Sequence, residues 1–238
     1  FCLGELVLSD LDQVEKKLER LRKQNKPASL AGRPDREVFD ELRETLEDNR
    51  FLSTLDLDPA LAKDLNSFSF LTRKPVFAVA NLSESAGAGG PPGVADFETA
   101  ARARGLTVVR MYAKLEKDLQ ELSPADREVF RAEYPFPLDG KAAFVRQAYA
   151  TAGLVSFLTV GSDEVRAWTV RRDCPALEAA AVIHKDFMNH FVRAEVVPYA
   201  KLVEAGSLAE ASRRGWLRSE KKEYPVQDGD VINFLAGR

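Results

Sequence analysis

An apolar residue recurs at alternating spacings of four and three near the start of the chain, which is typical of an amphipathic helix with a heptad seam. The seam consists of Val7, Leu11, Val14, Leu18 and Leu21. Residues 25–35, NKPASLAGRPD, hold two prolines and a glycine that interrupt this helix. A second stripe follows at Phe39, Leu42 and Leu46, so residues 35–55 are expected to return as a helix in an antiparallel, coiled-coil hairpin.

The middle of the chain alternates between short apolar runs and helical segments. Residues 75–80 and 106–112 predict two strands, each buried on both faces, and residues 94–104 predict a helix between them. The order strand, helix, strand implies a parallel pair joined by a crossover connection.

Capping residues predict where three other helices begin or end. Asp58 and Ser123 each precede a proline, and this pairing suits a helix start because the side chain caps free backbone N–H groups. We expect a further helix over residues 140–152, which Gly153 ends.

From residue 154 onward the pattern changes to β-strands. The expected strands are VSFLTV (155–160), EVRAWTV (164–170), FVRAEVV (191–197) and VINFL (231–235), and CPALEAAAVIHKDF (174–187) is the expected helix. Strands combined with one helix over residues 154–238 predict a small α+β domain of β-grasp type.

Charge and composition exclude several classes of protein. The net charge of −3 provides no global field for nucleic acid, so contact with RNA must come from a local patch, and DNA is not an expected partner. The sequence has neither an apolar run of ~20 residues, as a membrane span needs, nor a signal peptide pattern. Cys2 and Cys174 are too few for a disulfide framework. We therefore expect a cytoplasmic protein with no membrane partner.

Residues 85–93, SAGAGGPPG, lie between a predicted strand and a predicted helix, where a phosphate-binding loop often occurs. The dinucleotide-binding spacing that starts at Gly87 and Gly89 requires a small residue at position 92, but Pro92 stands there. Prolines also remove backbone donors that would face a phosphate group. We expect a surface loop here, and no G-x-x-x-x-G-K-S/T motif occurs in the 238 residues.

The motif NLSE, residues 81–84, follows the first predicted strand and has chemistry suited to a nucleotide base. Asn81 can both donate and accept hydrogen bonds. In the guanine-reading pattern Asn-Lys-x-Asp, the acid accepts from two neighbouring donors of guanine. Leu82 replaces the lysine here, and the longer Glu84 replaces the aspartate, which favours adenine over guanine. A polar turn without a ligand is the alternative interpretation of four residues.

Two other chemical constellations are not supported by the sequence. His184 and His190 are six residues apart, which does not place them on one helical face, and no second cysteine is near Cys174. A Cys174–His184 nucleophile pair lacks an evident third group that would orient it. We therefore predict no metal site and no catalytic residue, and the sequence does not define a redox role for Cys174.

A basic segment near the end of the chain, RRGWLRSEKK, surrounds one tryptophan. The candidate RNA-binding residues are Arg213, Arg214, Trp216, Arg218 and Lys221. Cations interleaved with an aromatic ring can bind phosphate and stack on a base. Glu220 and Glu223 dilute the charge, so an ordinary solvated face is the alternative.

Four segments occur in an order that resembles the C-terminal TGS region of the Obg-like ATPases, the YchF family. They are VSFLTVGSDEVRAWTV, IHKDF, FVRAEV and VQDGDVINF. The resemblance extends to residues 3–21, which are similar to the start of that family's coiled-coil domain, and to FSFLTRKP at 68–75. NLSE occurs where the family has its altered base-recognition motif.

This resemblance implies a fold class and a division into three domains. We expect a chain of α/β and α+β domains, with a helical coiled-coil arm over 1–72. Residues 73–153 would form the C-terminal part of a P-loop NTPase domain, and residues 154–238 a TGS domain of β-grasp type.

The resemblance also implies an activity and a partner. The parent protein would bind and hydrolyse ATP in preference to GTP, use Mg²⁺ and associate with ribosomes. Asn81 and Leu82 would border adenine, Leu82 through its backbone, and Glu84 would complete the loop.

The chain departs from the family pattern in two respects. The P-loop, the switch regions and the Mg²⁺ ligands of the family precede the matched segments, and the chain begins with Phe1 rather than Met. We therefore expect an upstream segment of the nucleotide domain, and we expect this chain alone neither to hydrolyse ATP nor to bind it tightly. Arg110, Met111 and Tyr112 stand where the family tends to have small residues, and their bulk would obstruct adenine.

Two alternative functions remain open from the sequence. One is a non-catalytic protein that binds RNA or the ribosome through its TGS domain and helical arm. The other is a structural interaction protein that works through the heptad hairpin.

Overall fold

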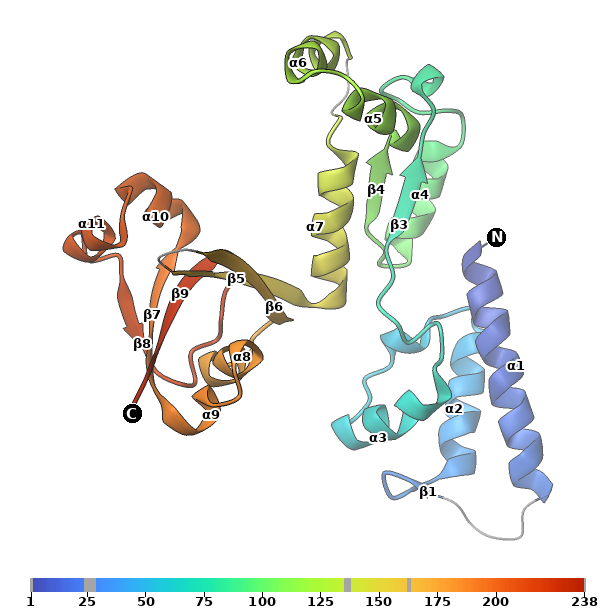
Figure 1. Cartoon of the computed structure of the whole chain (residues 1–238). Coiled ribbons are helices and arrows are strands. Elements are labelled where there is room, and N and C mark those ends of the chain that lie inside the picture. The colour runs from blue at the N-terminus through green and yellow to red at the C-terminus, as the bar shows by residue number, and fades with distance from the viewer. Residues whose placement is uncertain (1, 24–28, 135–137, 162–163, 238) are drawn as a thin grey trace. The chain divides into compact units, whose positions relative to one another are not determined.

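The structure is a computed structural model that describes residues 2–23, 29–134, 138–161 and 164–237. The chain forms two compact units, residues 1–76 and residues 77–238. Figure 1 shows the first unit in blue to teal and the second in teal to red.

The first unit is built from helices. Its elements are α1 (Cys2–Lys23), β1 (Ser29–Leu30), β2 (Arg33–Pro34), α2 (Asp35–Glu47), η1 (Leu52–Thr54), α3 (Pro59–Asp64) and η2 (Leu65–Phe68). In Figure 1, α2 runs back along α1, and the two helices pack on each other. The residues of the predicted stripes that are buried in this core are Val7, Val14, Leu18, Phe39, Leu42 and Leu46. The periodicity therefore predicted the buried faces of both helices.

The second helix of this unit is shorter than the sequence predicted. Helix α2 ends at Glu47 rather than near residue 55. Asn49 adopts a left-handed conformation with φ of 55°, and its N–H donates to the Leu46 carbonyl at 2.9 Å. Asparagine accommodates this conformation better than most residues, so the chain turns out of the helix there.

The third helix of the first unit begins as predicted. The Asp58 side chain accepts hydrogen bonds from the N–H groups of Ala60 and Leu61, both at 3.0 Å, and Pro59 is the first helical residue. These bonds satisfy two of the backbone donors that a helix start leaves free.

A buried carboxylate joins the two ends of the first unit. Asp10 of α1 is 0% exposed and accepts hydrogen bonds from Leu71 N at 2.9 Å, Thr72 N at 2.7 Å and Thr72 Oγ1 at 2.7 Å. These donors satisfy the carboxylate away from water, which makes its burial possible.

The second unit begins with a small parallel sheet and its helices. The elements are β3 (Ala78–Asn81), η3 (Glu84–Ala86), α4 (Val94–Ala103), β4 (Val108–Met111), α5 (Ala113–Gln120), α6 (Pro124–Glu133) and α7 (Gly140–Ala152). Strands β3 and β4 are parallel, with Ala78 opposite Val108 and Asn81 opposite Met111. The predicted crossover unit is therefore confirmed. Gly153, with φ of 64°, ends α7 as expected.

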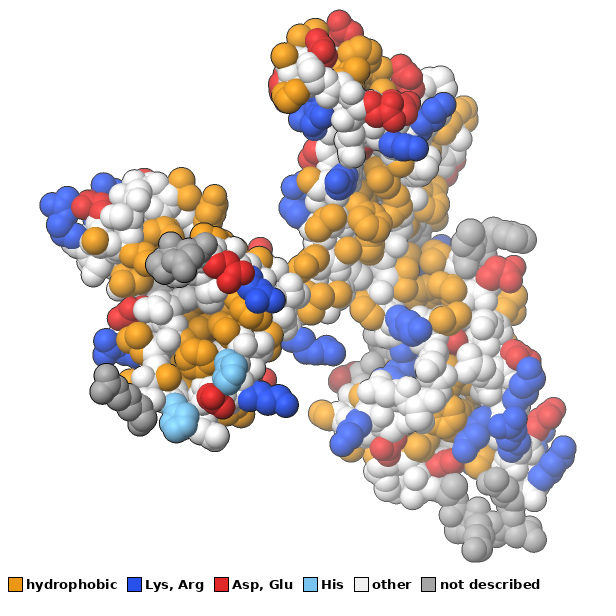
Figure 2. Space-filling model, in the orientation of Figure 1, with side chains coloured by type: hydrophobic (Ala, Val, Ile, Leu, Met, Phe, Trp, Pro, Cys, Tyr) orange, Lys and Arg blue, Asp and Glu red, His pale blue; other side chains and the backbone are white. Residues whose placement is uncertain are grey.

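The prediction that both strands are buried on both faces was wrong. Val79 is 36% exposed, and Arg110 is also exposed. Within the described residues this sheet has two strands, and part of each strand is open to solvent. Hydrophobic side chains also gather on the surface over α7 (Figure 2), where Phe144, Val145 and Tyr149 are exposed.

The rest of the second unit is a mixed sheet with short helices. Its elements are β5 (Leu154–Val160), β6 (Val165–Arg171), α8 (Ala176–Ile183), α9 (Phe187–His190), β7 (Phe191–Pro198), α10 (Tyr199–Ala205), α11 (Leu208–Arg213), β8 (Arg218–Glu220) and β9 (Asp230–Ala236). The strand order is β6-β5-β9-β7-β8, with β5 and β9 parallel and the other pairs antiparallel. Phe157, Val196 and Ile232 form its core with Ala179 and Ala180 of α8.

One predicted helix of this region is divided into two. The sequence predicted a single helix over residues 174–187, but α8 ends at Ile183 because His184 is extended, with φ of −154°. Helix α9 follows after a turn. Helices α10 and α11 were not predicted.

Helix length bears on the membrane question. Among the described residues, no helix is both long enough and apolar enough to cross a lipid bilayer.

Candidate nucleotide-base site

The candidate base-reading residues lie where the two parallel strands end. In open α/β sheets, ligands bind at the carboxyl ends of the strands. Asn81 is the last residue of β3, and its Oδ1 accepts a hydrogen bond from Ala113 N at 3.2 Å, just beyond β4. Leu82 N donates to the Met111 carbonyl at 2.8 Å. These two bonds fix the loop to the neighbouring strand.

Leu82 and Asn81 play different parts in this loop. The Leu82 side chain is buried in an apolar cluster with Ala80, Tyr112 and Leu115. Asn81 is exposed at the strand end. Leucine at position 82 therefore anchors the loop both through its side chain and through its backbone N–H.

The third predicted residue, Glu84, is held by a tyrosine fifty positions away. Tyr134 Oη donates to Glu84 Oε1 at 2.6 Å. This hydrogen bond to a carboxylate is the main cause that raises the pKa of Tyr134 above its ordinary value. Ser83 Oγ and Ser85 Oγ lie 2.9 Å apart on either side of Glu84.

A hollow of about 530 Å³ adjoins this loop. Its lining residues are Asn81, Leu82, Ser83, Glu84, Ser85, Lys114, Leu115 and Asp118. The structure thus places all three candidate nucleotide-binding residues, Asn81, Leu82 and Glu84, around one hollow. The volume of this hollow falls in the range of small-ligand sites.

Sequence reasoning missed two charged residues of the hollow, Lys114 and Asp118. They are four positions apart on α5, so they project from one side of the helix that follows β4. The order strand, turn, helix together with this spacing would have identified them.

The bulky residues Arg110 and Tyr112 contact the glycine-rich segment 85–93. Arg110 Nη1 donates to the Ala88 carbonyl at 3.0 Å, and Tyr112 Oη donates to the Gly87 carbonyl at 2.7 Å. Neither side chain, nor Met111, lines the hollow of about 530 Å³. Whether they obstruct adenine stays a prediction.

Arg110 also forms an ion pair with Glu98 of α4. The hydrogen bond from Arg110 is the main cause that lowers the pKa of Glu98, and the same bond raises the pKa of Arg110. Glu98 is buried, so this pair supplies the cation that its carboxylate needs.

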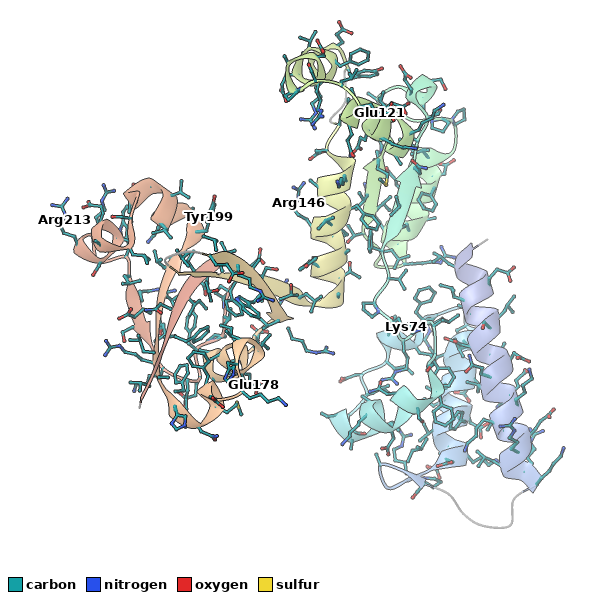
Figure 3. The ribbon with its side chains drawn as sticks, in the orientation of Figure 1. Lys74, Glu121, Arg146, Glu178, Tyr199 and Arg213 are labelled. Atoms are coloured by element: carbon teal, nitrogen blue, oxygen red, sulfur yellow. The ribbon has the colours of Figure 1, made fainter. Side chains whose placement is uncertain are left out.

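The structure only partly assembles the candidate RNA-binding residues. Arg213 Nε donates to Glu210 Oε2 at 2.8 Å, and Arg214 Nε donates to Glu210 Oε1 at 2.7 Å. Both arginines lower the pKa of Glu210. Figure 3 shows Arg213 pointing outward from the end of α11. The shared carboxylate reduces the positive charge that these two arginines offer to a phosphate.

Trp216 is less available for stacking than the sequence suggested. The Arg214 guanidinium lies 4.9 Å and the Lys201 ammonium 5.7 Å from its ring centroid. The ring packs against a small core that contains Val197 and Ala211. Trp216 thus contacts two cations and packs against a small apolar core.

Arg218 and Lys221 lie beyond Trp216, in β8 and the turn after it. Arg218 Nη2 donates to Tyr224 Oη at 3.0 Å and its Nη1 lies 3.3 Å from Glu220 Oε1. Lys221 is exposed.

Within the described ranges, no group of three or more His, Cys, Asp or Glu side chains is arranged to hold a metal ion. His184 Nδ1 lies 3.4 Å from Asp186 Oδ2, an exposed local pair. Burial raises the pKa of the Cys174 thiol, with a further contribution from Glu178. A raised pKa is typical of an unreactive cysteine.

Comparisons with known proteins give this geometry a family context. Residues 154–237 match the model YchF-GTPase_C, described as a protein of unknown function (DUF933). The ribosome-binding ATPase YchF of Bacillus subtilis (strain 168) is 34% identical over 232 residues, which cover 97% of this chain. The chain is a YchF homologue.

Other YchF proteins give the same result. The ribosome-binding ATPase YchF of Escherichia coli O157:H7 is 33% identical over 231 residues. The structure of the Schizosaccharomyces pombe YchF GTPase superposes with a TM-score of 0.80 at 24% identity, covering 98% of this chain and 64% of that one. The mixed α/β fold is therefore that of YchF.

The chain spans about two thirds of the length of these relatives. It covers 63% of the Bacillus subtilis and Escherichia coli YchF proteins. What the relatives' names state about ATP and the ribosome applies to those proteins.

Proposed function

We propose that this chain is the base-reading and ribosome-docking portion of an Obg-like, YchF-type P-loop NTPase that binds and hydrolyses ATP in preference to GTP. The observation that carries the proposal is the loop of Asn81, Leu82 and Glu84 at the carboxyl end of a parallel strand pair, beside a hollow of about 530 Å³. ATP and Mg²⁺ would be the ligands of the intact protein, and its compartment would be the cytoplasm.

Three domains carry the parts of this function. Residues 1–72 form the helical coiled-coil arm, residues 73–153 the C-terminal part of the nucleotide domain, and residues 154–238 the TGS domain. The match of residues 154–237 to the C-terminal YchF model supports the third domain.

The preference for adenine follows from what the loop offers a base. Leu82 stands where a guanine-reading loop has lysine, and its side chain is buried. The Leu82 N–H already donates to the Met111 carbonyl, so its carbonyl is the backbone group that would accept a hydrogen bond from the amino group of adenine. Glu84 is bonded to Tyr134 and is not a free carboxylate.

We expect no hydrolysis by this chain alone. Phosphoryl transfer depends on a phosphate-cradling loop and Mg²⁺ ligands, and the 238 residues contain no G-x-x-x-x-G-K-S/T motif. A base edge without a phosphate anchor should also bind ATP only weakly.

The experiment is to determine the intact mass and N-terminal sequence of the protein purified from its native source, and then to assay that product for ATP and GTP hydrolysis. A product with an upstream P-loop that hydrolyses ATP faster than GTP supports the proposal. A native product that starts at Phe1, or one that prefers GTP, contradicts it.

A second function has its own supporting observation. The cations of residues 213–221 gather on one segment around Trp216, and Arg213 and Lys221 are exposed. A non-catalytic protein would use this surface and the helical arm to bind RNA or the ribosome. Binding of ribosomes by the purified chain without any nucleotide would favour this alternative.

A further inference from the structure

The hydrogen bond between Tyr134 and Glu84 joins the end of α6 to the candidate base loop. Tyr134 Oη and Glu84 Oε1 are 2.6 Å apart, and Glu84 lines the hollow of about 530 Å³ while Tyr134 does not. We propose that Tyr134 is a specificity-determining residue that holds Glu84 away from the base edge and so disfavours guanine. This inference rests on the proposed function of the same site.

The tyrosine ring has contacts of its own with the apolar core. It packs against the apolar cluster that includes Leu82, Leu115 and Leu138. Phe130 of α6 stacks near it, with ring centroids 6.1 Å apart and an interplanar angle of 29°. The hydroxyl is therefore presented to Glu84 from a ring that is half-buried against the core and stacked on Phe130.

The hydrogen bond between Tyr134 and Glu84 should affect guanine and adenine differently, because the two purines present different groups. Guanine presents a ring N–H and an amino group side by side, and a free carboxylate accepts both with its two oxygens. Adenine presents a ring acceptor and an amino group, so a free carboxylate facing it would place one oxygen against the acceptor. Tyr134 uses one lone pair of Glu84 Oε1 and orients the carboxylate, so turning both oxygens towards guanine would compete with this hydrogen bond.

The test is an NMR titration of the ¹⁵N-labelled full chain with millimolar AMP and GMP, following the amides of residues 81–85. Wild type should bind AMP more tightly than GMP. Tyr134→Phe keeps the ring but frees the carboxylate, so the ratio of GMP to AMP affinity should rise about three- to tenfold. Tyr149→Phe, the same change on α7, is the matched control and should leave the ratio unchanged.

A second comparison, made in a chain that carries Glu84→Ala, tests whether the effect of Tyr134 passes through the Glu84 carboxylate. In the Glu84→Ala background, Tyr134→Phe should not change the ratio, because no carboxylate remains to be released. A ratio that stays at the wild-type value in Tyr134→Phe overturns the inference. So does an equal rise in the Glu84→Ala background, because the effect would then not pass through Glu84.

The titration also separates this inference from the function on which it rests. If AMP shifts the amides of residues 81–85 but Tyr134→Phe leaves discrimination intact, the specificity role alone is lost. If neither nucleotide shifts those amides in wild type, the base site itself is wrong and the inference is wrong with it.

Discussion

The Arg110 guanidinium of β4 and the Glu98 carboxylate of α4 form an ion pair that joins the second strand of the crossover unit to its helix. Arg110 also donates to the Ala88 carbonyl at 3.0 Å. One side chain thus connects the strand, the crossover helix and the glycine-rich segment that leads into it.

Glu98→Gln should destabilise the second unit by about 1–2 kcal/mol, because it removes the charge from a buried carboxylate that accepts from Arg110. The pKa of Glu98 is lowered in the folded chain, so its stabilisation is complete above the pKa of an unfolded glutamate, about 4.3. The contribution is lost as the pH falls through the lower folded pKa. Urea titrations at several pH values would measure both effects.

The matched control for this pair is Glu128→Gln on α6. Glu128 pairs with Arg131 at 3.3 Å, but its side chain is 75% exposed, so we expect a change below about 0.5 kcal/mol. Equal losses for the two variants would contradict the role assigned to Glu98.

Asp10→Asn should weaken the contact between α1 and residues 71–72, which joins the two ends of the first unit. The substitution leaves one acceptor for three donors and places an amide donor against backbone N–H groups, at a cost of about 2–3 kcal/mol. Hydrogen exchange at the Thr72 amide, which bonds to Asp10 directly, should accelerate accordingly. Asp12→Asn changes an exposed residue of the same helix, and Thr72 exchange should stay at the wild-type rate.

Gly140→Ala should destabilise the start of α7. A Cβ at position 140 would lie 2.5 Å from Met111 Cβ and 2.9 Å from Met111 Cα, which is too close for carbon atoms. Moving α7 away from β4 should cost about 1–3 kcal/mol. Gly89→Ala meets nothing within 4 Å and is the control, and thermal unfolding of the two variants should therefore diverge.

Arg213→Ala combined with Lys221→Ala should weaken ribosome binding if the basic segment contacts RNA. Each lost phosphate contact should reduce the slope of log affinity against log salt by about 0.7–0.9. Co-sedimentation of the chain with ribosomes over a range of salt concentrations would measure this slope. Lys185→Ala removes an exposed cation that lies outside the basic segment, and this variant should leave the salt slope unchanged.

Local patterns in the sequence predicted most of the elements but not all of their limits. Apolar periodicity identified the buried face of α1, and capping residues identified the starts of α3 and α6. The end of α2 depended on a left-handed Asn49, which has no periodic signal. The exposure of Val79 depended on how many strands the sheet contains, which a strand pattern does not encode.

A motif on one segment allows its residues to be predicted as neighbours, and Asn81, Leu82 and Glu84 do line one hollow. Contacts between distant residues were not predictable. Tyr134 and Glu84 are 50 positions apart, and Asp10 and Thr72 are 62 positions apart. Trp216 is a further example, since it packs against a small core, a contact that its neighbours in sequence do not indicate.

Helix α6 contains no buried residue, although Val129 and Phe130 are apolar. Its attachments include Arg127, which donates to two carbonyls at the end of α5 and to the Leu122 carbonyl just after it, and Tyr134, which bonds to Glu84. An element with so little buried surface opens at low free energy, independently of global unfolding. A protease added to the native protein should therefore cleave within α6 early, and a ligand that strengthens the contact with Glu84 should slow that cleavage.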